Sequence, residues 1–457
     1  MRCLNSGESK MLQKDILNYS TKLKFDDIVV DAVSGESTYL KITNSKVDSV
    51  VNDNSIDGSI FLSKSKRLIA EDLPDLSEKS VKKVLKKAAK TIGNLPPKKD
   101  YYGIAEGPFK YKGKAKPDQR ISEFQIGDLA NIAESMISEL DHKNLTDIAG
   151  MVTLEKLKDS LITNKEVNVN GSTAYIKVTA HIKTAEGISY QETAAFSSYS
   201  KINIKGFCDN LYYTVSQIKS RGKIKNGTYD LIYKPSSASN LLQEVTSAAT
   251  ISEVEEGSFL KGKLEHRIAN ENVSIIDSGI AKGMISSSYY DDEGYPTRDN
   301  YVIENGMLKT YLYNWSEAKK YNTQSTGNAG LIESEPNTLI LNYKNPEKSL
   351  DSLISEIDKG ILITNTWYTR FDNHSTGDFS TVPRDLAIYI ERGEPKFAIN
   401  QIEGTQTVGI RVNDNIIRML KNLESASKSS VQAISWDAEE PALVPDILVK
   451  GVKITTL

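Results

Sequence analysis

The sequence predicts an α+β protein, with an N-terminal α/β half followed by a large antiparallel domain of barrel or sandwich type. Three observations predict this class. Helical apolar spacing is concentrated in the first 222 residues, two-residue alternation indicates strands in this half as well, and strand signals dominate after residue 227. The 457 residues are 39% hydrophobic and 26% charged, which permits large cores and excludes wholesale disorder.

Residues 1–95 are predicted as a first α/β subdomain with antiparallel strands and flanking helices. We expect a helix over 10–23, then a strand, a turn centred on Gly35 and two more strands over 26–51. A further strand over 58–65 precedes a helix over 79–93, in which apolar residues recur at helical spacing opposite a lysine-rich face. Paired prolines in 94–100 end this helix and indicate a linker.

Residues 110–222 are predicted as a second α/β subdomain. A helix over 124–140 is followed by a β-meander over 165–198, and a second helix over 207–222 closes the segment. Asn170-Gly171 is a strong signal for a two-residue hairpin turn. Beyond that turn, Ile176, Val178 and Ile182 alternate with polar residues, as in a half-buried strand.

Residues 227–457 are predicted as one antiparallel β domain. Strand signals recur throughout it, and two similar stretches, 303–309 and 390–396, indicate hairpins with glycine in the turn. Helices are expected only around 238–248 and 414–426.

Composition also limits the classes of partner and the cell compartment. The net charge of −3 provides no general attraction to nucleic acid or anionic membranes. Cys3 and Cys208 make no disulfide framework, the N-terminus lacks the apolar core of a signal peptide, and no apolar run is long enough to span a bilayer. We therefore predict a cytoplasmic protein that binds neither nucleic acid nor membrane.

Most candidate sites for chemistry have an ordinary interpretation. The four histidines, His142, His181, His266 and His374, share no short motif and are predicted as ordinary surface residues. Cys208 follows an apolar helix stripe and is expected to be a small core residue. The lysines of helix 79–90 are expected to form a solvated face. Phosphate-binding glycine loops and the nucleophile elbow are absent from the sequence.

One stretch resembles the start of a calcium-binding loop. Asp53, Ser55, Asp57 and Gly58 have suitable spacing, but the position of the last, bidentate glutamate holds Lys64. We therefore favour a solvated turn between strands at this place.

Residues 241–248, LLQEVTSA, resemble a zinc-peptidase helix without its histidines. The surrounding C-terminal half carries a more specific resemblance. Asp292-Glu293-Gly294, Ile303-Glu304-Asn305-Gly306 and Thr326-Gly327-Asn328, in this order, resemble the TldD/PmbA family, also called modulators of DNA gyrase. The stretches 375–380, 390–395 and 445–454 agree, so the resemblance covers most of 225–455.

The resemblance implies specific expectations for a site. The TldD branch is a zinc metallopeptidase with a helix H-E-x-x-x-H and a later cysteine ligand, whereas the PmbA/TldE branch lacks these ligands and pairs with TldD. Aligned on this chain, the catalytic glutamate falls on Glu244, the histidines on Gln243 and Ala248, and the cysteine near Val382 or Pro383. We therefore expect no metal and no cofactor on this chain, and a structural or interface role for Glu244.

Three functions remain open from the sequence. The leading one is a non-catalytic, PmbA/TldE-like subunit that joins a TldD-like zinc peptidase, which alone would carry zinc, and helps to admit unfolded peptide as an added strand. The second is a zinc metallopeptidase active in its own right through other ligands, such as His266 or His374. The third is a non-enzymatic, peptide-binding homodimer.

Overall fold

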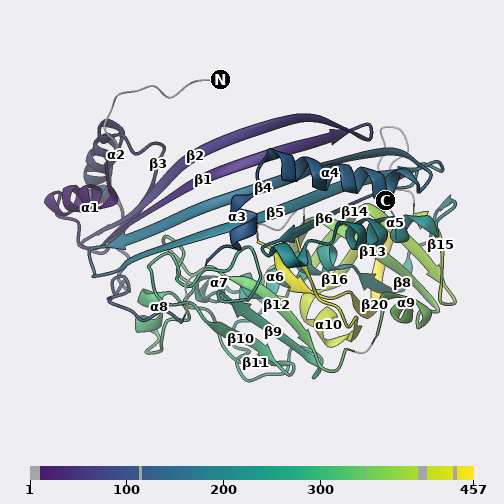
Figure 1. The fold of residues 1–457 in the computed structure, drawn as a ribbon. Helices are drawn as coiled ribbons and strands as arrows, with labels where there is room; N and C mark the ends of the chain where they lie inside the picture. Colours follow the sequence, from purple (N-terminus) through teal and green to yellow (C-terminus); the bar gives the residue numbers. More distant parts are fainter. Residues whose placement is uncertain (1–10, 113–115, 347, 400–408, 436–439, 457) are drawn as a thin grey trace.

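The computed structural model describes residues 11–112, 116–346, 348–399, 409–435 and 440–456, so Cys3 lies outside the described part. Figure 1 shows a long, twisted sheet from the N-terminal half lying across a β-rich C-terminal half. The α+β class predicted from the sequence, with a mainly antiparallel second half, is confirmed.

The N-terminal half is built on one antiparallel sheet in the order β3-β2-β1-β4-β5-β6. The strands are β1 Ile28–Thr43, β2 Lys46–Lys64, β3 Arg67–Leu73, β4 Leu145–Thr163, β5 Asn168–Thr184 and β6 Ser189–Phe196. β1 lies in the first predicted subdomain and pairs with β4 of the second. The segments 1–95 and 110–222 therefore share one sheet, while the exact domain boundaries stay a prediction.

The turn predicted at Gly35 is wrong. Gly35 lies inside β1, opposite Ser55 of β2 and Leu157 of β4. A Cβ atom on Gly35 would come within 3.1 Å of Leu157 Cδ2, so the glycine relieves crowding between strands. The chain turns later, at Asn44 and Ser45, whose φ values of 50° and 58° suit a two-residue hairpin turn.

The stretch 53–58 forms neither a calcium loop nor a solvated turn, so both interpretations of it are wrong. It runs along β2, with Asp53 opposite Ser37 and Gly58 opposite Ala32 of β1. Successive side chains of a strand point to opposite faces of the sheet. Asp53, Ser55 and Asp57 therefore share one face, but the extended strand spaces them about 6–7 Å apart in a row, so their oxygen atoms cannot wrap around one cation.

The hairpin predicted at Asn170-Gly171 is also wrong. Both residues lie inside β5, where they pair with Ser160 and Asp159 of β4. The alternation predicted further along this strand is confirmed, because Ile176, Val178 and Ile182 are fully buried.

Helices cover one face of the sheet. The predicted helices are confirmed as α1 Gln13–Lys22, α2 Glu78–Thr91, α4 Ile126–Asp141 and α5 Ile204–Ser216. Figure 1 shows α1 and α2 at one end of the sheet and α4 further along it. Short turns of helix, α3 Gln119–Glu123, η1 Ile92–Asn94 and η2 Tyr199–Lys201, connect these elements. Each long helix buries an apolar stripe, which in α2 contains Val81, Leu85 and Ala88.

The opposite face of the sheet meets the C-terminal half. Near one end, Val29, Phe61 and Leu161 pack against Tyr101 and Ile104 of the linker region. Tyr290 and Leu331 of the C-terminal half pack against the same cluster, so a site can form between this face of the sheet and the loops of the C-terminal half.

The C-terminal half contains a closed, five-stranded barrel. Its strands are β8 Gly227–Tyr233, β13 Lys359–Asn373, β14 Asp378–Glu391, β16 Ile410–Asn415 and β20 Ile447–Thr456. The order β13-β8-β20-β16-β14 closes because β13 also pairs with β14. The strands β7 Arg221–Gly222, β15 Glu394–Ile399 and β17 Leu423–Ala426 extend this sheet.

A second sheet lies beside the barrel, in the order β11-β10-β9-β12-β19-β18. Its strands are β9 Val273–Ser278, β10 Asp299–Glu304, β11 Met307–Leu308, β12 Thr338–Tyr343, β18 Val431–Ala433 and β19 Ala442–Val444. The remaining helices are α6 Pro235–Ala248, α7 Ile251–Glu256, α8 Trp315–Lys320, α9 Leu350–Ser355 and α10 Ile416–Lys421.

Both hairpins predicted in this half are confirmed. Asn305-Gly306 and Arg392-Gly393 turn the chain between paired strands, and all four residues have positive φ. The helix predicted around 238–248 is α6, but the one predicted over 414–426 is shorter: α10 ends at Lys421, and Leu423–Ala426 forms β17. The expectation of only two helices in this half is wrong, because the short helices α7, α8 and α9 also occur there. Within the described residues, no helix combines the length and the apolar character needed to cross a membrane.

Candidate functional site

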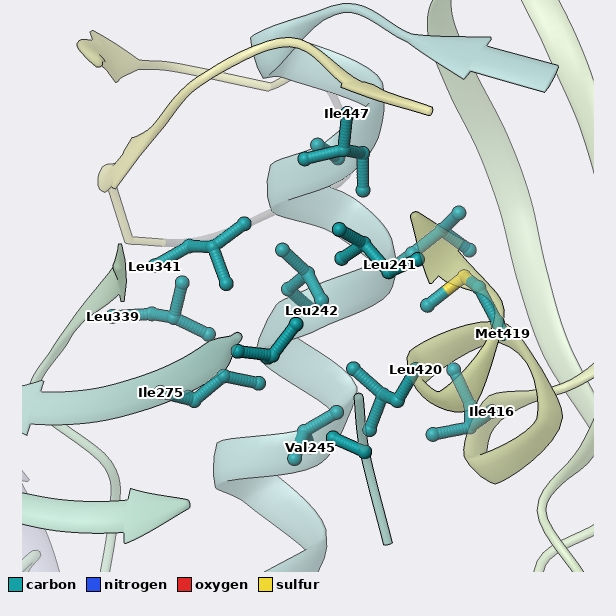
Figure 2. Packing of buried hydrophobic residues seen from close by; sticks show 14 of the residues in the cluster. Leu241, Leu242, Val245, Ile275, Leu339, Leu341, Ile416, Met419, Leu420 and Ile447 are labelled. Carbon is teal, nitrogen blue, oxygen red and sulfur yellow. The ribbon is translucent and has the colours of Figure 1, made fainter. Parts of the chain in front are cut away.

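The helix α6, which carries the predicted site, runs through the core of the C-terminal half. Its residues Leu241, Leu242 and Val245 are fully buried, because this spacing places them on one helical face. Figure 2 shows them packed among residues of the second sheet, α10 and β20: Ile275, Leu339, Leu341, Ile416, Met419, Leu420 and Ile447. Apolar burial therefore sets the position of the helix.

Buried polar groups tie the first turns of α6 to strand β13. The Ser237 hydroxyl donates to the carbonyl oxygen of Ile363 at 2.9 Å, and Asn240 Nδ2 donates to that of Thr366 at 2.7 Å. Because a buried amide without partners is costly, these bonds hold the helix in one orientation on the barrel.

Gln243, which the resemblance aligns with the first histidine of the zinc-binding branch, is engaged in contacts within the chain. It is half-buried, and its Nε2 donates to Ser239 Oγ at 3.1 Å and to the carbonyl oxygen of Glu440 at 2.5 Å. The side chain thus links α6 to the segment before β19, and its nitrogen serves as a donor.

The other two positions on α6 differ in their surroundings. Ala248, at the place of the second histidine, is 2% exposed and belongs to the apolar core. Glu244 is half-buried beside Gln243 and has an interaction partner in the folded chain. The two positions expected for histidine ligands therefore lie on one helix, without suitable donors.

The expected position of the cysteine ligand lies beside this helix. Val382 and Pro383 on β14 pair with Trp367 and Thr366 of β13. Thr366 is the residue that accepts hydrogen bonds from Asn240, one turn before Gln243. The placement taken from the resemblance is therefore spatially consistent, although the chain supplies valine and proline there.

This donor set does not fit zinc. A catalytic zinc ion is held by three nitrogen, sulfur or carboxylate ligands and keeps one open position. Here Gln243 offers an amide engaged through its nitrogen, Ala248 a methyl group, and Val382 and Pro383 aliphatic carbon. Only Glu244 has a group of the required kind.

The histidines do not supply a substitute site. His142 is the exposed C-cap of α4, and His266 contacts the carbonyl oxygen of Leu264 through Nδ1 at 2.9 Å. His374 Nε2 lies 3.2 Å from Glu253 Oε2 on the surface. Across the ranges that the structure describes, no three or more His, Cys, Asp or Glu residues form a group that could hold a metal ion.

A polar cluster beside α6 was missed by the sequence reasoning. Asp385, which follows the predicted cysteine position, has a positive φ of 67°. Burial raises its pKa, while the charges of Arg384 and His181 and a hydrogen bond from Asn365 act in the opposite direction. His181, predicted as an ordinary surface residue, is half-buried and brings the N-terminal sheet into this cluster.

Local sequence carried only a weak signal for that cluster. Aspartate tolerates positive φ better than most residues, but Pro383-Arg384-Asp385 matches no motif. Pairing between β13 and β14, with an irregular register near Asn365, brings these residues together.

Asn328, one of the residues that carry the family resemblance, belongs to a buried polar network. Asp277 is fully buried and accepts hydrogen bonds from the side-chain amides of Asn300, Asn328 and Asn337, at 3.2, 2.9 and 3.2 Å. Gly327, between Thr326 and Asn328, has a φ of 75°. Part of this motif therefore stabilises the fold.

The second part of the motif joins the two halves. Buried Asp291 accepts hydrogen bonds from the backbone amides of Glu293, Tyr295 and Ala329 at 3.1, 2.9 and 3.0 Å. The Glu293 carboxylate in turn accepts a hydrogen bond from the backbone amide of Ala105 at 3.0 Å. Burial raises the pKa of Glu293 strongly, and the nearby Asp291 adds to the effect.

Comparison with known proteins identifies relatives. The family model described as "PmbA/TldA metallopeptidase C-terminal domain" matches residues 226–456, just over half of the 457-residue chain. The "Metalloprotease MJ0996" of Methanocaldococcus jannaschii is 25% identical over 389 residues, 79% of this chain and 82% of that protein. The "Uncharacterized protein MJ0231" of the same organism is 28% identical over 286 residues, 60% of this chain and 66% of that protein.

A solved structure supports the fold over almost the whole length. TldE from Thermococcus kodakarensis superposes with a TM-score of 0.80 at 22% sequence identity, covering 97% of this chain and 99% of that one. The match of the family model to residues 226–456, together with the relatives above, shows that the chain belongs to the PmbA/TldD metallopeptidase family.

Proposed function

We propose that this chain is a PmbA/TldE-like, non-catalytic subunit of a cytoplasmic peptidase that acts on unfolded peptides. Its partner would be a TldD-like subunit that carries the zinc ion. One observation supports the proposal: the residues that the resemblance aligns with the zinc ligands of the TldD branch are Gln243, Ala248 and Val382 or Pro383, and these offer no histidine, cysteine or carboxylate. The presence of only two cysteines supports the reducing compartment.

The chemistry behind this proposal is the activation of water. A bound zinc ion lowers the pKa of its water from about 15.7 to about 7, which supplies a nucleophile at neutral pH. The residues at these positions cannot hold zinc in that way, so Glu244 has no activated water from which to take a proton. Peptide hydrolysis would then take place on the partner subunit.

The N-terminal sheet offers a surface for assembly with that partner. β3 pairs only with residues 58–64 of β2, so the edge of β2 over 46–57 carries no neighbouring strand among the described residues. Val47, Val50, Val51 and Ile56 on this stretch are exposed. An unpaired edge with exposed apolar side chains favours association with another chain.

Reconstitution tests the function. The chain would be purified alone and after co-expression with a TldD-like protein from the same organism, and both samples would be assayed for zinc by mass spectrometry and for cleavage of unfolded peptides. We expect cleavage only by the complex. Glu244→Gln should leave the activity of the complex within about twofold of the wild type, because this glutamate meets no metal-bound water.

Two outcomes would overturn the proposal. Equimolar zinc and peptide cleavage in the isolated chain, lost in Glu244→Gln, would indicate a peptidase with its own ligands. Self-association and peptide binding without any complex would indicate a peptide-binding homodimer. For the assembly surface, Val51→Lys should reduce co-purification of the partner, whereas Val431→Lys, at an exposed valine elsewhere, should not.

A further inference from the structure

A cavity lies between the N-terminal sheet and a loop of the C-terminal half. Its volume is about 570 Å³, which lies within the range of small-ligand sites. Tyr111 of the linker region, Asp159 of β4, Gly171 of β5, and Tyr289 and Tyr290 of the loop after β9 line it. We refer to these five residues and the space between them as the tyrosine pocket.

The walls of the pocket are held in place by contacts between distant segments. The Tyr111 hydroxyl donates to the carbonyl oxygen of Gly294 at 2.7 Å, and the Tyr290 hydroxyl donates to Asp159. The rings of Tyr111 and Tyr290 meet edge to face, with centroids 6.4 Å apart. These contacts fix two aromatic rings and a carboxylate around one space.

The absence of a side chain at Gly171 leaves space for the Asp159 carboxylate in the wall of the pocket. A Cβ atom on Gly171 would lie 2.6 Å from both carboxylate oxygens of Asp159. The glycine of the Asn170-Gly171 pair therefore does not serve a turn, and its missing side chain lets the carboxylate lie against β5. This explains why a glycine lies within the paired part of β5.

The charge of the pocket is negative and lacks a cation from the protein. Asp31 of β1 is a close neighbour of Asp159, and the pair repels, since Asp159 contributes to a raised pKa of Asp31. Over the described ranges, neither aspartate forms an ion pair with lysine, arginine or histidine. The lining residues include no lysine, arginine or histidine.

We propose that the tyrosine pocket binds the cationic side chain of an arginine or lysine residue in an extended peptide. A carboxylate attracts the cationic group, and the faces of tyrosine rings bind it through cation–π contacts. The aliphatic part of the side chain can pack against the edges of the same rings. An anionic ligand would meet only repulsion from Asp159 and Asp31. The identity of the ligand as a peptide rests on the proposed function, whereas recognition of the cation follows from the pocket itself.

Peptide binding to the full chain tests this inference. Fluorescence anisotropy would compare a dye-labelled, capped peptide with one arginine among alanines and glycines against the same peptide with citrulline, its neutral isostere. We expect binding of the arginine peptide to be about tenfold tighter, and Asp159→Asn to remove that difference. Asp53→Asn, which removes an equal charge from an exposed position on β2, should leave both affinities unchanged.

A second variant keeps the test decisive if Asp159→Asn alters folding. Thr173 also lines the cavity, so Thr173→Arg would place a guanidinium group in the pocket from its own wall and should abolish binding of the arginine peptide. Thermal unfolding of each variant would verify its fold. Equal affinity for arginine and citrulline peptides, or unaltered binding by folded Asp159→Asn and Thr173→Arg proteins, would overturn the inference.

The inference and the proposed function can fail separately. Nα-acetyl-arginine amide would be used as a competitor for the labelled peptide. If it displaces the peptide from the wild-type chain and Nα-acetyl-citrulline amide does not, the pocket recognises the cation even where no peptidase complex forms. If a complex forms and cleaves peptides without any preference for arginine over citrulline, the inference alone is wrong.

Discussion

Asp31 on β1 and Asp159 on β4 lie on the same face of the N-terminal sheet, one step apart diagonally across paired strands. Burial raises the pKa of Asp31 to about 6, and repulsion by Asp159 adds to the effect. Two carboxylates therefore lie close together beside the tyrosine pocket, and their repulsion lowers the free energy of unfolding. Measurements of unfolding can detect this effect.

The first prediction concerns this pair. A carboxyl group whose pKa is higher in the folded than in the unfolded chain destabilises the fold; the effect grows as the pH rises from the ordinary pKa of 3.8 and is complete above about pH 6. Asp31→Asn should therefore increase the free energy of unfolding at pH 7.5 by roughly 2 kcal/mol, and by clearly less at pH 4.5, where the folded wild type is protonated. Urea unfolding at the two pH values measures the difference.

Asp53→Asn is the control, because Asp53 is exposed on β2. It should change the free energy of unfolding by no more than about 0.5 kcal/mol at either pH. A stabilisation by Asp31→Asn that is the same at pH 7.5 and 4.5 would contradict the assignment of the effect to ionisation.

The second prediction concerns two glycines. Gly171→Ala should lower the free energy of unfolding by no more than about 1 kcal/mol, because the new Cβ would displace only the Asp159 carboxylate, the end of a side chain that can move aside. Gly127→Ala, in α4, should instead raise it by about 0.5–1 kcal/mol, since open space surrounds that position and alanine favours a helix. Thermal unfolding distinguishes the two signs, and stabilisation by Gly171→Ala would show that the carboxylate does not lie there.

The third prediction concerns the core around α6. Leu242→Ala removes a fully buried side chain and should cost about 2–5 kcal/mol of unfolding free energy. Ile126→Ala, at a position that is 46% exposed, should cost less than about 1 kcal/mol. Denaturant titration of both variants makes the comparison, and similar losses would be inconsistent with α6 as the centre of the core.

The fourth prediction concerns attempts to restore zinc ligands. Ala248→His forces an imidazole into the apolar core and should destabilise the fold by about 1–3 kcal/mol or more. Gln243→His, at a half-buried position, should be much less disruptive. Calorimetry measures both unfolding temperatures. An unaltered unfolding temperature in Ala248→His would mean that the core around the second histidine position can accept a ligand.

Local pattern and resemblance predicted much of this protein. The helices over 79–93 and 124–140, the hairpins at Asn305-Gly306 and Arg392-Gly393, and the α+β class follow from apolar periodicity and turn chemistry. The placement of Gln243, Glu244 and Ala248 on one helix was also expected, because the C-terminal half resembles its family closely.

The long strands were beyond local reasoning. Asn305-Gly306 forms a hairpin turn, whereas Asn170-Gly171 is part of the extended strand β5. The two dipeptides are the same, so their local conformational preferences do not explain this difference. The difference arises because β4 presents an uninterrupted partner along Asn170-Gly171, so hydrogen bonds to that strand outweigh the turn preference.

The sequence alone determined the alternation of buried and exposed side chains, the turn-forming residues and the absence of a zinc-binding set of side chains at Gln243, Ala248 and Val382. Only the tertiary structure decided which strands pair, that Asp385 and His181 come together beside α6, and that Asp159 and Tyr290 enclose a pocket. The reason is physical: periodicity depends on neighbours along the chain, whereas pairing and cavities depend on the free energy of contacts between residues far apart in sequence.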